Sequence, residues 1–272
     1  MSYAFVNGQF MASDYATIGI QDMAIQRGYG IFDFFKVMKG MPVFLEDHLA
    51  RFYGSAAELR LNISVSKDDL VGYIHELISR NNWQEAGIRI TLTGGYAPDG
   101  YSVYEPNLIM AGQPIQLPTE VSETGLKLLS HEHIRQLPKV KSIDYLMAVW
   151  MQDKVKAAGA DELIYHQNGW ISECPRANVF IVTADGTLAT PREGALFGIT
   201  RKKVLELAGK LFKAEERPVH LSELETATEA FVTSTTKIVH PIFEVDGKQI
   251  GEGLTGPVTR KLFEAYDKLL PA

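Results

Sequence analysis

Alternating hydrophobic and polar residues predict short strands joined by tight turns at the beginning of the chain. Tyr3–Phe10 contains two such runs around an Asn-Gly pair, and Ile31–Leu45 contains two more around a Lys-Gly pair. Pairs of this kind adopt the positive φ angles that two-residue hairpin turns require. Further strands are expected at Gly87–Thr93 and Pro106–Gly112. The first part of the chain is therefore predicted to be a meander of strands.

Hydrophobic residues spaced three and four apart predict two helices between these strands. Glu46–Leu61 has this spacing, and Ser66 is expected to cap the helix that follows. Two prolines without hydrophobic periodicity come after the last of these strands. We therefore expect a first domain of residues 1–113, a linker at 114–120 and a second domain of residues 121–272.

The second half of the chain also mixes strands with helices. Strands are expected at Leu126–Ser130, Leu163–Tyr165, Trp170–Ser172, Val179–Val182, Thr187–Ala189 and Ala230–Ser234. Helices are expected at Ser142–Ala158, Thr200–Phe212 and Thr255–Leu270. Abundant hairpins with interspersed helices favour an α+β fold over a doubly wound parallel sheet. No Gly-x-Gly-x-x-Gly follows a predicted strand, so a dinucleotide site is disfavoured.

The amino-acid composition argues against several classes of function. Hydrophobic residues make up 46% and charged residues 22% of the chain, as in an ordinary globular protein. The formal charge of −6 provides no cationic field for nucleic acid or anionic lipid. No apolar run approaches the roughly 20 residues that a membrane helix needs. Cys174 is the single cysteine, so no internal disulfide can form, and a cytoplasmic location is expected.

Two segments suggest binding of a phosphorylated group, and a third places a lysine where it can be held at the edge of the core. Phe197–Arg201 leads into a helix with Thr200 in the expected N-cap position, and a helix start suits an anion. Thr233–Thr236 ends an apolar strand with a cluster of hydroxyl donors. Lys141 immediately precedes a predicted amphipathic helix whose apolar side includes Leu146, Val149 and Trp150. Each signal alone is weak, since capped helices and exposed lysines are common.

The order of motifs along the chain is more specific. K-S-I-D-Y-L is followed by G-A-D-E-L-I, S-E-C-P-R-A-N-V-F, L-F-G-I-T-R and F-V-T-S-T-T, and it is preceded by G-Y-G-I-F-D-F-F-K-V and E-D-H-L-A-R-F. This order resembles the class IV aminotransferases, which are fold-type IV pyridoxal-phosphate enzymes, and the likeness covers nearly the whole chain. It implies a two-domain α+β fold, a pyridoxal 5'-phosphate cofactor and a homodimer. The substrates would be an amino acid and a 2-oxo acid, and no metal is implied.

The resemblance also assigns roles to individual residues. Lys141 would carry the cofactor aldehyde covalently and afterwards move a proton from the substrate Cα, which requires a deprotonated amine. Glu173 would face the pyridine nitrogen and favour the protonated ring. Arg51 would hold the cofactor phosphate through charged hydrogen bonds. The remaining cofactor contacts would come from Tyr145, Ile199, Thr200 and Thr235.

The substrate carboxylate requires a cationic partner. The Arg-x-His trap that follows an Ala-Pro pair in D-amino-acid transaminases is absent here, because Asp-Gly-Tyr follows Ala-Pro. Arg27 and Arg89 are the candidates instead, and alternation puts Arg89 on the polar face of its strand. Phe32 is a candidate wall of the side-chain pocket. The amides of Thr235 and Thr236 are the alternative, as in a branched-chain-type site.

Four functions stay open at this point. F-D-F-F-K-V looks closer to the D-amino-acid transaminase pattern Y-E-V-V-K-V than to the branched-chain pattern F-E-G-I-R. We therefore rank D-amino-acid transaminase first, branched-chain L-amino-acid transaminase second and aminodeoxychorismate lyase third. A non-catalytic protein that binds a phosphorylated ligand is disfavoured, because both Lys141 and Glu173 are present.

Overall fold

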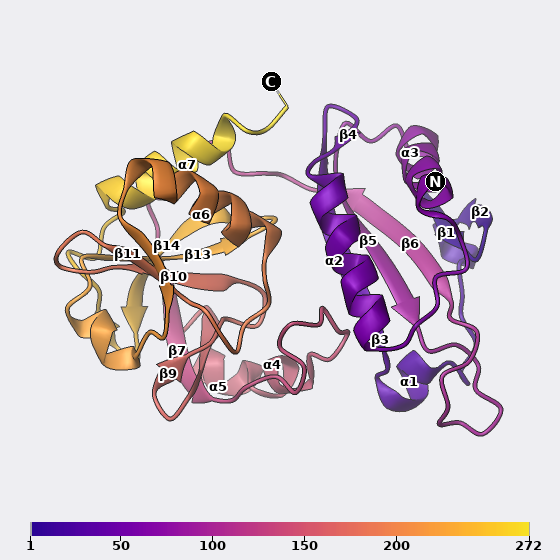
Figure 1. Cartoon of the computed structure of the whole chain (residues 1–272), viewed down its shortest axis with the longest axis horizontal. Helices are drawn as coiled ribbons and strands as arrows, with labels where there is room; N and C mark the ends of the chain where they lie inside the picture. The colour runs from indigo at the N-terminus through magenta and orange to yellow at the C-terminus, as the bar shows by residue number, and fades with distance from the viewer. Residues whose placement is uncertain (1, 272) are drawn as a thin grey trace. The chain divides into compact units, whose positions relative to one another are not determined.

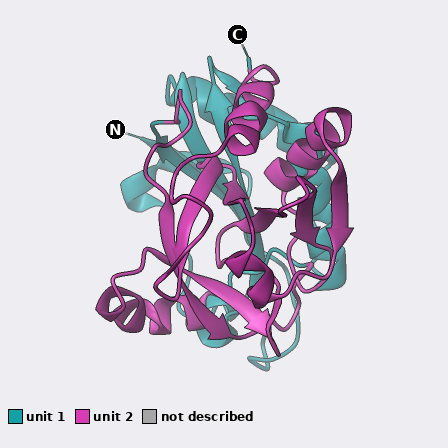
Figure 2. Cartoon of the chain, turned by 90° about the vertical axis from the view of Figure 1, so that its left-hand side faces the viewer, with its two compact units in different colours: residues 1–116, 140–144, 271 teal, residues 117–139, 145–270, 272 magenta. Residues whose placement is uncertain are grey.

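The computed structural model describes residues 2–271 and divides into two compact units (Figure 2). Unit 1 runs to Gln116 and also takes in Val140–Asp144. Unit 2 consists of Leu117–Lys139 and Tyr145–Leu270. The boundary after Gln116 lies inside the linker that the sequence suggested. The short segment Val140–Asp144 belongs by its contacts to the unit that precedes it in the chain.

Unit 1 is built on an antiparallel sheet with the strand order β2-β1-β6-β5-β3-β4, and helix α2 lies across one of its faces (Figure 1). Its elements are β1 (Tyr3–Val6), β2 (Gln9–Ala12), η1 (Ser13–Tyr15), α1 (Met23–Arg27), β3 (Gly30–Met38), β4 (Met41–Pro42), α2 (Leu45–Glu58), α3 (Lys67–Arg80), β5 (Glu85–Thr93) and β6 (Leu108–Pro114). The strands and the two long helices expected from the sequence are present. The short helix α1 was not expected.

Side chains of successive β3 residues point to opposite faces of this sheet, so the two faces have different contacts. Ile31 and Phe35 are fully buried in the hydrophobic core that also contains Phe52 of α2. Successive residues of a strand point to opposite faces. Asp33 therefore shares the face that packs on α2, and Phe32 belongs to the other face.

Unit 2 is built on a mixed sheet with the order β12-β11-β10-β13-β14-β7-β8-β9, and β15 pairs with β14. Its elements are β7 (Leu126–Glu132), α4 (Leu146–Trp150), α5 (Gln152–Ala157), β8 (Glu162–Gln167), β9 (Trp170–Ile171), β10 (Asn178–Val182), β11 (Leu188–Pro191), α6 (Ile199–Leu211), β12 (Ala214–Arg217), η2 (Leu221–Glu225), β13 (Glu229–Ser234), β14 (Ile238–Val245), β15 (Lys248–Gln249) and α7 (Pro257–Asp267). Helix α7 packs on α6, β13 and β14, and helix α6 also packs on β13. The expected α+β class is confirmed.

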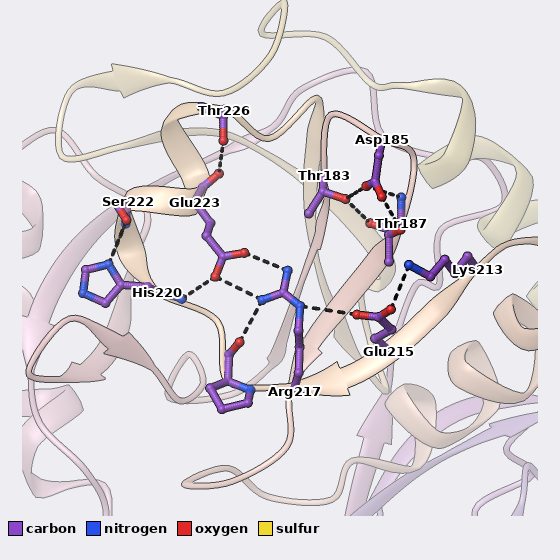
Figure 3. Close-up of polar contacts among 11 residues, drawn as sticks. Thr183, Asp185, Thr187, Lys213, Glu215, Arg217, His220, Ser222, Glu223 and Thr226 are labelled. Atoms are coloured by element: carbon purple, nitrogen blue, oxygen red, sulfur yellow. Dashed lines mark hydrogen bonds and ion pairs between the residues drawn. The ribbon is translucent and has the colours of Figure 1, made fainter.

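A polar network fixes the chain around β12 and η2 (Figure 3). Arg217 donates to the two carboxylate oxygens of Glu223 at 3.1 and 2.7 Å, and Glu223 also accepts from the His220 N–H at 2.8 Å. The Arg217 Nε lies 3.6 Å from a Glu215 oxygen. Asp185 closes the β10–β11 turn by accepting a backbone N–H two residues later, at 3.2 Å. These contacts stabilise a part of unit 2 in which no ligand-binding residue was expected.

The helix expected at Ser142–Ala158 begins later than its hydrophobic pattern indicates. It consists of α4 and α5, because the residues before Leu146 are extended along β3 of unit 1. Leu146, Val149 and Trp150 were expected to face the core, but they are 77%, 68% and 63% exposed. Ala148 is buried instead. The expected orientation of this helix is therefore wrong for the single chain.

Helix α6 is capped by Gly198 and not by Thr200, which corrects the expected N-cap. A Cβ atom at Gly198 would lie 2.2 Å from Oδ1 of Asn178, so this close approach requires glycine. Thr200 lies in the first turn and is buried. Burial raises the pKa of Tyr266 to about 12, and a hydrogen bond with Thr200 opposes that shift.

The helices are short. The two longest among the described residues, α2 and α3, have 14 residues each. Within residues 2–271 no helix has both the length and the hydropathy that crossing a membrane would require. In the same range no three His, Cys, Asp or Glu side chains are grouped so that they could hold a metal ion.

Candidate active site

Backbone hydrogen bonds hold Lys141 at the edge of β3. The Phe32 N–H donates to the Lys141 carbonyl oxygen at 2.9 Å. The Lys141 N–H donates to Ser55 Oγ of α2 at 3.2 Å. The next residue, Ser142, forms an antiparallel bridge with Ile31. These contacts fix the position of the lysine without using its amine.

The Lys141 amine shares an aromatic ring with a guanidinium group. Lys141 Nζ lies 4.4 Å from the centroid of the Phe32 ring, and Arg89 Cζ lies 3.7 Å from the same centroid. Arg89 is opposite Phe34 in the β3–β5 register, so it shares the face of Phe32, as alternation along its strand predicted. Two cationic groups at one ring create a positive potential that favours a carboxylate or a phosphate.

Arg51 belongs to a buried ion cluster on the face of β3 that packs on α2. Its Nε and Nη2 each donate to a different carboxylate oxygen of Asp33 at 2.8 Å, in the two-pronged geometry that suits a guanidinium. His48 Nδ1 lies 2.7 Å from Asp33 Oδ1. The side chains of Asp33 and His48 are only 1% and 3% exposed. This arrangement fixes the guanidinium plane of Arg51.

The charges in this cluster follow from burial and contact. Burial raises the pKa of the Asp33 carboxyl, but the charge of Arg51 and hydrogen bonds from Arg51 and His48 outweigh it, so the pKa lies far below its usual range. Burial lowers the pKa of His48, with smaller effects in the same direction from the charges of Arg51 and Lys141. Together these outweigh the hydrogen bond and the charge of Asp33, which raise that pKa. His48 is therefore neutral at pH 7 and carries its proton on Nδ1, facing Asp33.

In unit 2 the carboxylate of Glu173 is buried and hydrogen-bonded at both oxygens. Glu173 Oε1 accepts from Arg135 Nε at 2.6 Å, and Oε2 accepts from the Leu196 N–H at 2.9 Å. Arg135 also donates to the Pro138 carbonyl oxygen at 2.6 Å. The Glu173 side chain is 6% exposed. Its orientation is thus set by one arginine and one backbone amide.

The loop containing Leu196 connects Glu173 to the end of β13. Asn178 Nδ2 donates to the Leu196 carbonyl oxygen at 2.7 Å, and Asn178 lies opposite Thr233 in the β10–β13 pair. Thr233 Oγ1 is buried and has no hydrogen-bond partner in residues 2–271. A buried polar atom without a partner is rare and requires an explanation. A polar ligand at the end of β13 would supply one.

The other residues expected to contact ligand in unit 2 lie at the ends of elements. Tyr145 is the N-cap of α4, and Thr235 and Thr236 form the turn between β13 and β14. Ile199 and Thr200 are the first two residues of α6. The first amides of a helix have no acceptor inside it, and the helix dipole favours an anion there.

Arg27 and Arg89 occupy different places in unit 1. Arg27 lines a cavity of about 810 Å³ together with Tyr101 and Tyr104. Neither Arg89 nor Lys141 is among the described residues that line this cavity. Within one chain, the two arginines expected to bind the substrate carboxylate are therefore not brought into one pocket.

The groups present fit a phosphorylated aldehyde that has a basic ring nitrogen. Lys141 provides an amine, and Glu173 provides a buried and oriented carboxylate. In unit 1 Arg51 is a cationic group whose Nε and Nη2 bind Asp33. In unit 2 the start of α6 and the Thr233 hydroxyl, which has no partner in residues 2–271, suit a phosphate. This is the donor set that pyridoxal 5'-phosphate uses.

The family model described as amino-transferase class IV matches residues 30–245, a range that contains both Lys141 and Glu173. The chain is a class IV aminotransferase. Enzymes of this class use pyridoxal 5'-phosphate, so the cofactor predicted from the motifs is confirmed. The protein is a transferase that moves an amino group between an amino acid and a 2-oxo acid.

Individual relatives agree with the family over nearly the whole chain. The D-alanine aminotransferase of Bacillus licheniformis is 31% identical over 262 residues, which covers 94% of this chain and 93% of that protein. The crystal structure of the Escherichia coli branched-chain amino acid aminotransferase superposes with a TM-score of 0.91 at 28% identity, covering 98% of this chain and 94% of that one. A second crystal structure, of the T.th. branched-chain amino acid aminotransferase with pyridoxamine 5'-phosphate, has a TM-score of 0.90 at 26% identity, with coverage of 98% and 93%.

Several residues that contact the expected site residues or their neighbours were not predicted. These are Asp33, His48, Arg135, Asn178 and Leu196. The three-residue spacing of His48 and Arg51 puts them on one face of α2, which is a signal that the sequence carries. Asp33 and Asn178 lie inside motifs that carried the resemblance. No local pattern marks Arg135, whose contact with Glu173 spans 38 residues.

Proposed function

We propose that this class IV aminotransferase acts on D-amino acids and transfers their amino group to a 2-oxo acid. The observation that carries the proposal is the grouping of the Lys141 amine and the Arg89 guanidinium at the Phe32 ring. An amine for the reaction and a cation for the substrate carboxylate are then close together. The D-configuration is supported by the β3 sequence F-D-F-F-K-V and by the D-alanine aminotransferase of Bacillus licheniformis.

In this proposal Lys141 moves the proton. Pyridoxal 5'-phosphate, when bound, supplies the electron sink that stabilises the charge left at the substrate Cα. Lys141 Nζ would hold the aldehyde group of the cofactor. As a free amine it would take the proton from the substrate Cα. Phe32 limits the space in which the amine moves.

Glu173 and Arg51 hold the two ends of the cofactor in this proposal. Glu173 would accept a hydrogen bond from the protonated ring nitrogen, and its contacts with Arg135 and Leu196 keep the carboxylate in position. Arg51 binds the phosphate, with its plane fixed by Asp33. The first amides of α6 and the turn after β13 provide further phosphate donors.

Arg51→Ala is expected to weaken cofactor binding while leaving substrate preference unchanged. A lost charged hydrogen bond of about 1.5–3 kcal/mol corresponds to a roughly tenfold to hundredfold higher dissociation constant. Titration of the apoenzyme with pyridoxal 5'-phosphate measures it. Pyridoxal without the phosphate is the control ligand, because its affinity should not change.

The same substitution leaves the Asp33 carboxylate buried without its cation, which costs stability of about 3–5 kcal/mol. The double variant Asp33→Asn, Arg51→Met removes both charges and separates the two effects. It should recover thermal stability but not cofactor affinity. Wild-type affinity in Arg51→Ala, or an equal loss for pyridoxal, would reject the phosphate contact.

We further propose that Arg89 and Arg27 bind the substrate α-carboxylate. Arg89 lies beside Lys141 at Phe32, and Arg27 lines a cavity of its own chain. The two arginines can act on one substrate if Arg27 serves the site of a second copy of the chain. The apolar residues Leu146 and Val149 on the exposed side of α4 support a homodimer. Sedimentation equilibrium giving the mass of one chain would contradict that assembly, and a cytoplasmic location stays a prediction.

Arg89→Leu and Arg27→Leu are each expected to raise KM for every amino acid roughly tenfold to a hundredfold while sparing cofactor affinity. The reason is the loss of the cation that pairs with the α-carboxylate. Amines without a carboxylate serve as control substrates and should lose much less. If both variants keep wild-type half-reaction kinetics, the carboxylate is bound elsewhere, for which the Thr235 and Thr236 amides are the candidates.

The second candidate function is a branched-chain L-amino-acid aminotransferase, which the superposition with the Escherichia coli enzyme favours. Half-reactions with D-alanine, D-glutamate, L-leucine and L-glutamate, followed by cofactor absorbance, distinguish the two. We expect the D-substrates to react at least about tenfold faster. Faster reaction of the L-substrates would promote the second candidate. No amino transfer with any of them would favour the lyase.

A further inference from the structure

Helix α6 begins with an unfavourable run of charge. Arg201, Lys202 and Lys203 follow one another near its start, and no acid is among the described residues of its first turn. The free N–H groups and the dipole of a helix make its beginning positive, so acids are preferred there and cations are disfavoured. The basic run is therefore placed where the helix itself opposes it.

Arg201 differs from the two lysines because it is buried. Its side chain is only 5% exposed, whereas Lys202 is exposed and Lys203 is half-buried. Arginine is rarely buried without a paired acid. Arg201 Nη2 donates to Glu216 Oε2 at 2.7 Å, but the side chain of Glu216 is 45% exposed. Solvent screens an acid that is so exposed, so Glu216 offsets the buried charge only in part.

One donor of the Arg201 guanidinium is not used by the part of the chain that the structure describes. Nε is buried and has no hydrogen-bond partner in residues 2–271. Nη2 donates to the Pro191 carbonyl oxygen at 2.9 Å in addition to Glu216. Buried polar atoms are nearly always paired, and a buried donor without an acceptor lowers stability. The positive charge on Nε is thus not balanced by an acceptor within residues 2–271.

The contacts of Arg201 also determine where the start of α6 lies. Pro191 is the last residue of β11, and Glu216 belongs to β12, which pairs with β11 in parallel. On another strand, Asn178 Nδ2 donates to the carbonyl oxygen of Leu196 at 2.7 Å, just before the helix. The first turn of α6 is therefore fixed to three strands of the sheet, and the directions of its free amides are fixed with it.

We propose that Arg201 is a positioning residue for the cofactor phosphate at the start of α6 and that its buried charge strengthens phosphate binding there. The inference rests on the proposed function in one respect, which is that this phosphate lies at the first amides of α6. Arg201 contacts none of the reacting atoms. The phosphate dianion supplies the negative charge that the acids of the chain supply only in part, so binding is stronger and stabilises the fold more when Arg201 is present.

Titration of the apoenzyme with pyridoxal 5'-phosphate tests the proposal without turnover. Arg201→Met should raise the dissociation constant roughly threefold to thirtyfold, as expected for one partly buried charge at a helix end. Pyridoxal, which lacks the phosphate, is the control ligand, and its affinity should change little. Arg201→Lys should retain part of the affinity, because it keeps the charge.

Thermal unfolding separates this role from a purely structural one. A residue that only stabilises the fold affects the apoenzyme and the cofactor-loaded enzyme equally. Arg201→Met should instead lower the thermal midpoint of the loaded enzyme more than that of the apoenzyme, because the attraction for the phosphate is lost together with the unfavourable charge. Equal losses in the two forms would overturn the proposal.

Arg217→Met is the matched control. Arg217 lies in β12 and donates to both carboxylate oxygens of Glu223 at 3.1 and 2.7 Å, and it has no assigned role in binding. This variant should lower the thermal midpoints of both forms by similar amounts. Its affinity for pyridoxal 5'-phosphate should stay at the wild-type value.

Glu216→Gln provides a test that does not depend on the folding of Arg201→Met. It removes the acid that partly offsets Arg201 but keeps an acceptor oxygen for Nη2. Pyridoxal 5'-phosphate should therefore bind roughly twofold or more tightly, whereas a residue that acted only through its ion pair would bind it more weakly after the change. Unchanged or weaker binding in Glu216→Gln overturns the role of the charge.

Two further outcomes in Arg201→Met would contradict the proposal. They are a wild-type affinity for pyridoxal 5'-phosphate and an equal loss of affinity for pyridoxal. Both would leave the proposed amino transfer by Lys141 intact. An enzyme that transfers no amino group would contradict the proposed function, and the apoenzyme titrations would still decide the role of Arg201.

Discussion

Lys141→Ala is expected to abolish turnover while preserving the fold. The variant should lose the borohydride-reducible link to the cofactor, and its kcat/KM should fall by about 10⁵-fold or more, because the anchor and the proton carrier are lost together. The fold should persist because the contacts that position this residue are made by its backbone. They link its N–H to Ser55 Oγ and its carbonyl oxygen to the Phe32 N–H.

Lys139→Ala is the matched control, since Lys139 lies two residues away and has no assigned role in the reaction. Borohydride reduction followed by peptide mapping measures the link directly in both variants. The control should retain the link and most of the activity. A link that persists in Lys141→Ala at another lysine would overturn the assignment. Circular dichroism and the thermal midpoint of Lys141→Ala exclude misfolding as the cause of inactivity.

Local signals predicted most of the fold. The Asn-Gly turns at Asn7 and Asn168 and the Asp-Gly turn at Asp185 each join strands in the structure. Ser66 caps α3 by accepting from the Asp69 N–H, as its position suggested. Such features depend only on a few neighbouring residues, so they can be read from the sequence alone.

Strand β14 was missed because its sequence argues against a central strand. Pro241 lies in the middle of it and cannot donate a hydrogen bond. In the structure Pro241 is opposite Phe231 of β13, but pairing with β7 begins only at Ile242. The N–H that proline lacks is therefore not needed for the hydrogen bonds between β14 and β7. The sequence around Pro241 does not show where this pairing begins, so the strand could not be predicted from it.

The same limit applies to the candidate active site. Lys141, Glu173 and Arg51 were identified by several ordered motifs, which depend on order and spacing along the chain. Their partners depend on folding. Asp33 meets Arg51 across 18 residues, and Arg135 meets Glu173 across 38. Charge and burial at these contacts decide how each side chain is oriented, and a single sequence does not encode that in a local pattern.

Glu173→Gln is expected to slow the half-reaction by a factor on the order of 10²–10³, the range seen when one charge-stabilising group is removed from an active site. A neutral amide no longer favours the protonated ring nitrogen, so the electron sink at the substrate Cα is weaker. Phosphate binding should be nearly unchanged, because Arg51 and the α6 amides are untouched. Single-turnover absorbance changes with D-alanine measure the rate.

The contacts of Glu173 add an effect on stability that has to be separated from the effect on rate. Both of its oxygens accept hydrogen bonds, from Arg135 and from the Leu196 N–H, whereas glutamine has a single acceptor oxygen and a donor NH₂ group. One donor then faces another donor in a buried place, at a cost of about 1–3 kcal/mol in the free energy of unfolding.

Glu162→Gln is the matched control for this effect. Glu162 is also a buried acid of unit 2 that accepts from an arginine, with Arg176 Nη2 at 2.8 Å, and it has no assigned role in the reaction. It should lose stability without losing rate, whereas Glu173→Gln should lose both. Equal single-turnover rates in the two variants would show that the partner of the ring nitrogen lies elsewhere and that Glu173 acts only through its contact with Arg135.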